Sequence, residues 1–129
     1  WGYYSEKDKL QNSRVVIIDT IGILADLYAF SDAAYVGAGF GAGVHSVIEP
    51  AVYENAVSFG PNFHIVDMAV SLLNNNLASV IETAEDFAQF CTLLEDKVKL
   101  VRIREDLKDY ILNQQIAAEN ITQAIFNHD

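Results

Sequence analysis

The chain has 129 residues, of which 51% are hydrophobic, and a net charge of −10 from 8 basic and 18 acidic residues. This composition predicts one domain with a sizeable core and argues against disorder, and no apolar run approaches the roughly 18 to 20 residues that span a bilayer. No Lys or Arg occurs between Arg14 and Lys97, so nucleic-acid binding through phosphate contacts is not expected. A single cysteine, Cys91, excludes an internal disulfide.

Short apolar runs alternate along the chain with stretches of helical period. Residues 1–13, which start at Trp1, show no clear period and indicate a linker or the end of a fragment. The runs that predict buried strands are 15–19, 33–36, 56–59 and 78–81. Helices are expected from a cap at Asp19 or Thr20 to Ser31, and over 46–53, 65–73, 84–94, 97–112 and 114–127.

Strands that alternate with helices predict βαβ units. The expected fold class is therefore α/β, a Rossmann-like, doubly wound parallel sheet of four strands with a helical C-terminal tail. Ligands of such sheets bind beyond the C-terminal ends of the strands. Three turns are expected at that edge: 19–22, 37–46 and 60–62.

The turn after the second predicted strand is rich in glycine, with Gly37, Gly39, Gly41 and Gly43 inside seven residues. A strand, a glycine-rich turn and a helix start together favour an anion site, although a loop that needs glycine only for close packing stays open. The spacing is not that of a dinucleotide fingerprint, and no Gly-Lys-Ser/Thr follows. Without nearby Lys or Arg, a bound phosphate must use backbone N–H groups, a histidine or cations from elsewhere.

Three side chains near these turns are candidates for chemistry. Glu49 can accept two hydrogen bonds from a ribose diol, or simply complement a helix dipole. His45 can donate to a phosphate or a sugar carboxylate, or be merely exposed. Asp19 lies where a catalytic carboxylate often stands, but it can equally cap a helix. Neither metal-ligand spacing nor the context of a nucleophile is found, so no metal site or hydrolase triad is expected.

The order of these motifs resembles a known family. Asp19-Thr20-Ile21-Gly22, the strand to Gly37, the run from Gly43 to Ala51 and Phe59-Gly60-Pro61 resemble the C-terminal, donor-binding domain of 3-deoxy-D-manno-octulosonic acid (Kdo) transferase, a GT-B glycosyltransferase. The resemblance implies transfer of Kdo from CMP-Kdo to a lipid A precursor in lipopolysaccharide core biosynthesis, at the cytoplasmic face of the bacterial inner membrane. No cofactor is implied. An N-terminal domain absent from this chain would hold the acceptor and the catalytic base.

The resemblance also implies which residues contact the CMP donor. They lie on the helix start and on the turn after the first predicted strand. The implied residues are Gly43, His45, Ser46, Val47, Ile48 and Glu49 at the helix start, and Ile21, Gly22 and Ile23 at the turn. The sequence departs from the family at Ser46, where Asn is usual, and at Ile23, where many members have Glu.

Residues 14–129 are accordingly expected to be a partial nucleotide-sugar donor-binding domain without transferase activity of its own. A sheet that lacks its first strands exposes an edge, so self-association is expected. Two alternatives stay open from the sequence. One is a non-enzymatic Rossmann-like interaction module, and the other is a GT-B relative that uses a UDP-sugar, for instance a 2-epimerase.

Overall fold

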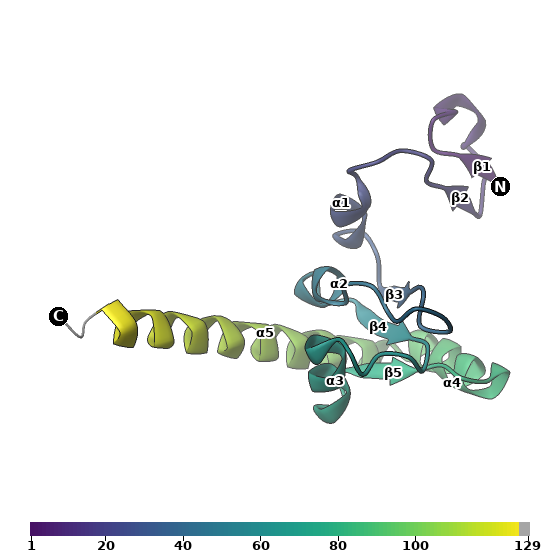
Figure 1. The fold of residues 1–129 in the computed structure, drawn as a ribbon. Helices are drawn as coiled ribbons and strands as arrows, with labels where there is room; N and C mark the ends of the chain where they lie inside the picture. Colours follow the sequence, from purple (N-terminus) through teal and green to yellow (C-terminus); the bar gives the residue numbers. More distant parts are fainter. Residues whose placement is uncertain (127–129) are drawn as a thin grey trace.

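The computed structural model describes residues 1–126, and Figure 1 shows its elements. They are β1 (Gly2–Tyr3), the 3-10 helix η1 (Lys7–Lys9), β2 (Val16–Ile17), α1 (Leu24–Tyr28), β3 (Ala33–Val36), α2 (Ile48–Val52), β4 (Ala56–Phe59), α3 (Asp67–Asn74), β5 (Ala78–Val80), α4 (Ala84–Glu95) and α5 (Lys97–Phe126). Among the residues described, no helix is both long and apolar enough to cross a membrane.

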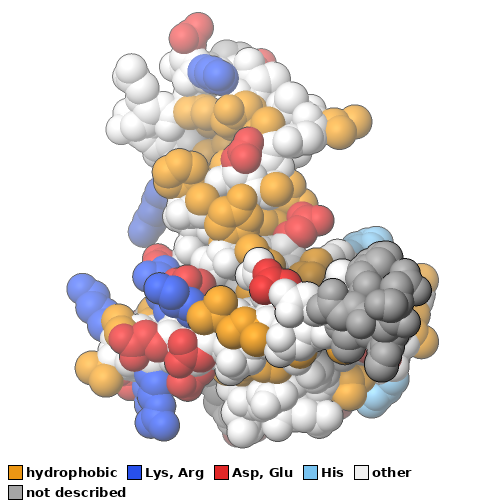
Figure 2. Space-filling model, turned by 90° about the vertical axis from the view of Figure 1, so that its left-hand side faces the viewer, with side chains coloured by type: hydrophobic (Ala, Val, Ile, Leu, Met, Phe, Trp, Pro, Cys, Tyr) orange, Lys and Arg blue, Asp and Glu red, His pale blue; other side chains and the backbone are white. Residues whose placement is uncertain are grey.

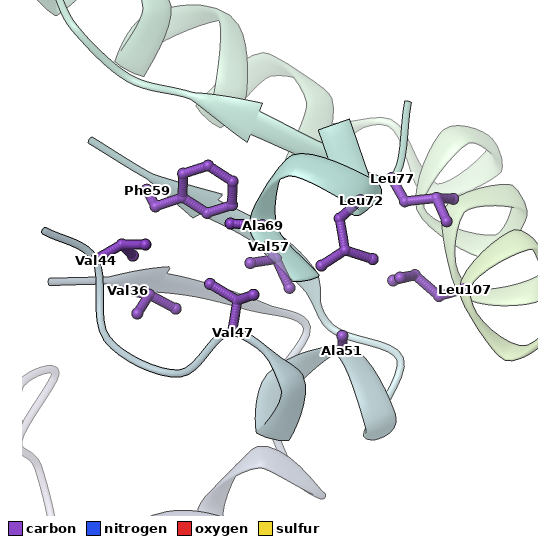
Figure 3. Close-up of a cluster of buried hydrophobic side chains, with 10 residues drawn as sticks. All are labelled: Val36, Val44, Val47, Ala51, Val57, Phe59, Ala69, Leu72, Leu77 and Leu107. Carbon is purple, nitrogen blue, oxygen red and sulfur yellow. The ribbon is translucent and has the colours of Figure 1, made fainter. Parts of the chain in front are cut away.

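The main sheet has three parallel strands in the order β3-β4-β5, with Ala33 opposite Ala56 and Val57 opposite Ala78. Because side chains alternate along a strand, β4 contributes to a core on each face. On one face, Val57 and Phe59 pack with residues of α2, α3 and α5, as Figure 3 shows. On the other face, Ala56 packs with Phe90 of α4. Helices on both faces confirm the predicted doubly wound α/β fold.

The deepest packing lies on the first of these faces, between the sheet, α3 and α5. Leu72 and Leu107 are fully buried there. Full burial of a leucine side chain stabilises the fold by roughly 1.5 to 3 kcal/mol. The predicted helical tail is thus joined to the sheet by its own core residue.

The C-terminal helix α5 is continuous over 30 residues, so the prediction of two helices, 97–112 and 114–127, is wrong. Neither Gly nor Pro interrupts 97–126, and nothing in the sequence therefore ends the helix near residue 113. The last predicted residue of the second helix, 127, lies outside the described part. Figure 1 shows the distal half of α5 running away from the sheet.

The first predicted strand, 15–19, differs most from expectation. Only Val16 and Ile17 form β2, both are 41% exposed, and β2 pairs with β1 in a separate two-stranded parallel sheet. The prediction of a strand buried on both faces within a four-stranded sheet is therefore wrong. Figure 1 shows β1 and β2 apart from the main sheet, so they are not part of its layers. Figure 2 shows hydrophobic side chains over this upper part of the molecule with a few charged ones among them, and a larger group of charged side chains lower down.

Candidate functional site

The glycine-rich loop after β3 is fastened to the loop after β4. The Asn62 amide N–H donates to the Gly39 carbonyl at 2.8 Å, and its side-chain Nδ2 donates to the Gly41 carbonyl at 3.0 Å. A Cβ on Gly39 would lie 2.5 Å from the backbone N of Gly60. Close packing therefore accounts for Gly39, and the loop holds a fixed path from β3 towards α2.

Gly43 redirects the chain just before the predicted site. Its φ of +117° is in a region that side-chain-bearing residues rarely adopt, and an added Cβ would lie 2.8 Å from Cδ1 of Ile65. Gly43 lines a hollow of about 230 Å³ together with Asn62 and Ile65. Its contribution to the neighbouring site is therefore the direction of the backbone.

A larger cavity of about 410 Å³ lies between α1, the end of β3 and α2. It sits at the C-terminal end of β3, where ligands of doubly wound sheets bind. Its lining residues are Leu24, Tyr28, Tyr35, Val36, Gly37, His45, Ser46 and Glu49. The fold thus brings three of the predicted site residues, His45, Ser46 and Glu49, to one cavity, and all three are exposed to solvent.

The remaining predicted residues lie around this cavity without lining it. The Val47 side chain is 0% exposed in the core, so only its backbone can meet a ligand. Ile48 is 45% exposed but is not part of the cavity lining, and Gly43 lies in the neighbouring hollow. Ile21, Gly22 and Ile23 form the approach to α1, and Ile21 is fully exposed. Leu24, which follows Ile23 and is the first residue of α1, does line the cavity.

The helix that begins the site is shorter than predicted. α2 starts at Ile48 rather than at 46 and has five residues, with Val47 as its N-cap. The dipole of a helix grows with the number of aligned peptide units. Because α2 is so short, its dipole adds little attraction for an anion. Any binding of negative charge here depends on individual donors, such as the Ser46 hydroxyl and the His45 ring.

Tyr28 and Glu49 interact electrostatically in the cavity. Burial raises the pKa of the Tyr28 hydroxyl, and the charge of Glu49 raises it further, so the phenol stays protonated at neutral pH. Among the described residues that line the cavity, none is Lys or Arg. Sequence reasoning missed Tyr28 and Tyr35: Tyr28 falls on the apolar stripe of the helix expected up to Ser31, and Tyr35 falls in the strand expected over 33–36. The hydroxyl of a tyrosine within such a stripe was the available signal.

Asp19 is neither the cap of α1 nor part of this cavity. Its carboxylate accepts hydrogen bonds from the backbone N–H and the hydroxyl of Ser5, and these bonds lower the pKa of Asp19. The N-cap of α1 is Ile23, which provides no side-chain cap. Asp19 therefore ties the turn between β1 and η1 to the segment after β2, and the predicted cap is wrong.

A second hollow of similar size, about 440 Å³, lies beside α5 and carries the basic side chains Lys99 and Arg102. Lys99 pairs with Asp96 at 3.4 Å and Arg102 pairs with Asp106 at 3.9 Å, so acidic partners offset their charge. Within residues 1–126, no group of three or more His, Cys, Asp and Glu side chains could hold a metal ion.

The chain is similar in sequence to known transferases. No family model matches the chain. A 3-deoxy-D-manno-octulosonic acid transferase of Chlamydia muridarum is 32% identical over 123 residues, which cover 93% of this chain and 29% of the relative. One of Rickettsia prowazekii is 28% identical and covers 81% of this chain and 23% of its own. The resemblance to Kdo transferases is confirmed.

Similarity extends to a glycosyltransferase of another name and to a solved fold. A bifunctional glycosyltransferase/methyltransferase of Fusobacterium nucleatum is 27% identical over 84% of this chain and 17% of that protein. The crystal structure of the C-terminal CMP-Kdo binding domain of WaaA from Acinetobacter baumannii matches with a TM-score of 0.60 and 22% identity, over 74% of this chain and 53% of that one. This match confirms the fold of a GT-B C-terminal domain. The chain spans less than a third of each of these sequence relatives.

Proposed function

We propose that this chain is the CMP-Kdo-binding portion of a Kdo transferase, an enzyme that transfers Kdo to a lipid A precursor in lipopolysaccharide core biosynthesis. The main support is the 32% identity to the Chlamydia muridarum transferase across 93% of the chain. The cavity that gathers His45, Ser46 and Glu49 supports the same role, because these residues lie in the segment that carries the resemblance.

The cavity suits the nucleotide half of the donor. At about 410 Å³ it falls within the roughly 300 to 1,000 Å³ of small-molecule sites. Glu49 would accept hydrogen bonds from both ribose hydroxyls, while Ser46 and His45 would donate to the phosphate. The backbone N–H groups of Val47 and Ile48 would add donors, and the Ile21–Ile23 turn would border the base.

Transfer itself requires groups outside this chain. An acceptor hydroxyl attacks the anomeric carbon of Kdo, a base takes the hydroxyl proton, and CMP leaves with the electron pair of the broken bond. The longer relatives extend well beyond the aligned segment. Such a region would supply the acceptor site, the catalytic base and the cationic side chains for the donor phosphate. We place the whole enzyme at the cytoplasmic face of the inner membrane. The chain alone binds the donor but does not transfer it.

Titration calorimetry with CMP tests this proposal. Glu49→Ala should weaken CMP binding by about 10- to 100-fold, because it removes hydrogen bonds to a charged acceptor. Gly43→Val should weaken it as well, since a β-branched residue does not fit a φ of +117°. Glu85→Ala, on an exposed position of α4, removes the same charge away from the cavity and serves as the control.

Three results would contradict the proposal. If Glu49→Ala combined with Gly43→Val leaves CMP binding undiminished, the cavity is not the CMP site. Tighter binding of UDP than of CMP would favour the UDP-sugar alternative. Absence of affinity for any nucleotide, with loss of a protein partner on mutation of the glycine loop, would favour the non-enzymatic interaction module.

A further inference from the structure

Tyr28 faces the same cavity as Glu49 and belongs to none of the predicted site segments. We propose that Tyr28 is a positioning residue: in the nucleotide complex its hydroxyl donates a hydrogen bond to the Glu49 carboxylate and holds it in place for a ribose diol. The preference for a ribonucleotide over a nucleotide without ribose hydroxyls then depends on Tyr28. This inference rests on the proposed function of the cavity.

The backbone around Tyr28 is fixed by a buried side chain. Asn55 is fully buried, and its Nδ2 donates to the Tyr28 carbonyl at 2.9 Å and to the Tyr53 carbonyl at 3.2 Å. The Ser31 hydroxyl, which has one proton to donate, lies within hydrogen-bond distance of both Asn55 Oδ1 and the Tyr28 carbonyl and joins the same group. Buried polar groups with satisfied hydrogen bonds hold their neighbours in one arrangement.

The same asparagine fixes the helix that carries Glu49. Tyr53 is the C-cap residue of α2, and Glu49 lies in the first turn of that helix. One buried side chain therefore bonds to the end of α1 and to the end of α2. The backbone segments that carry Tyr28 and Glu49 are consequently held relative to each other by these hydrogen bonds.

The chemical states of the two groups suit such a bond. Tyr28 is partly buried, and both its burial and the nearby charge of Glu49 keep the phenol protonated, so it is a donor. An ionised carboxylate only accepts, and it has sites for about four hydrogen bonds. A bond from Tyr28 leaves room for both ribose hydroxyls and reduces the freedom that Glu49 loses when the nucleotide binds.

The test compares CMP with 2′,3′-dideoxycytidine monophosphate, which lacks both ribose hydroxyls, by calorimetry on wild-type chain and Tyr28→Phe. The phenyl ring keeps the packing and removes only the hydroxyl. We expect Tyr28→Phe to weaken CMP binding by about fivefold and to leave binding of the dideoxy nucleotide unchanged. In Glu49→Gln, which has already lost the charged acceptor, adding Tyr28→Phe should change CMP affinity by less than about twofold. Tyr53→Phe, at the end of α2 and outside the cavity, is the matched control.

Each other result counts against the inference in a recognisable way. Equal weakening of both nucleotides by Tyr28→Phe would mean that Tyr28 only supports the structure. Unchanged affinities for both nucleotides in Tyr28→Phe would overturn the positioning role while the proposed function stands. Failure of the wild-type chain to bind CMP, or to distinguish it from the dideoxy nucleotide, would overturn the ribose role of Glu49 and this inference with it.

Discussion

Gly39→Ala should destabilise the protein far more than Gly37→Ala, although both change one glycine of the same loop. A Cβ at residue 39 would meet the N, Cα and C atoms of Gly60 at 2.5, 2.7 and 2.9 Å, whereas a Cβ at residue 37 meets nothing within 4 Å. All three atoms belong to backbone, so no side chain can rotate away. The two loops must separate by about 1 Å to restore van der Waals contact.

The size of the effect follows from what that separation disrupts. Overpacking of a tight contact costs about 1 to 3 kcal/mol, and loss of the hydrogen bond from Asn62 to Gly39, 2.8 Å long, costs about 1 kcal/mol more. We therefore expect Gly39→Ala to lower the free energy of unfolding by about 2 to 4 kcal/mol. Gly37→Ala should change it by less than about 0.5 kcal/mol.

Urea unfolding followed by far-UV circular dichroism measures both variants against the wild-type chain. The comparison is internal, because both substitutions add the same methyl group to the same loop. If Gly39→Ala unfolds at the same urea concentration as Gly37→Ala, the packing of Gly39 on Gly60 is not what fastens the loop.

Three further predictions concern other parts of the molecule. Asn55→Ala should lower the free energy of unfolding by about 2 to 4 kcal/mol, because it leaves buried partners unsatisfied, whereas exposed Asn75→Ala should cost less than about 1 kcal/mol; equal unfolding midpoints would refute this. In the capping box of α4, the hydrogen bond from the Thr83 hydroxyl, and to a lesser extent bonds from backbone N–H groups, lower the pKa of Asp86. The stabilisation from this capping box is therefore present above the ordinary pKa of 3.8 and is lost as pH falls through the lower pKa of the folded state. NMR titration should show that pKa rising in Thr83→Ala, and an unchanged value would contradict it. Exposed β2 and the uncovered residues beside it should drive self-association, which light scattering of a monodisperse monomer would disprove.

The main sheet was predictable because its strands have local signals. The apolar runs at 33–36, 56–59 and 78–81 are bounded by turn-forming residues, and they match β3, β4 and β5 to within one residue. The run at 15–19 has the same apolar character but gains no second layer. Burial of a strand depends on what packs over it, and that cannot be read from the strand itself.

The site was predictable only where its residues are adjacent in sequence. His45, Ser46 and Glu49 fall within five residues, and the fold brings all three to the cavity. Tyr28 and Tyr35 reach the same cavity from α1 and β3. The position of Tyr28 there depends on the hydrogen bond from Asn55, a residue far along the chain. Apart from its hydroxyl group, neither tyrosine leaves a local pattern. Val47 is adjacent in sequence to these site residues, yet its side chain is buried in the core. Its position in the sequence gives no sign of this.

Binding of the nucleotide in the cavity between α1, β3 and α2 can be followed residue by residue in an NMR titration of isotopically labelled chain with CMP. We expect the largest amide shifts at residues 45–49, with smaller shifts at Gly37 and Tyr28. Shifts centred on Lys99 and Arg102 beside α5, or no shifts at saturating CMP, would contradict it.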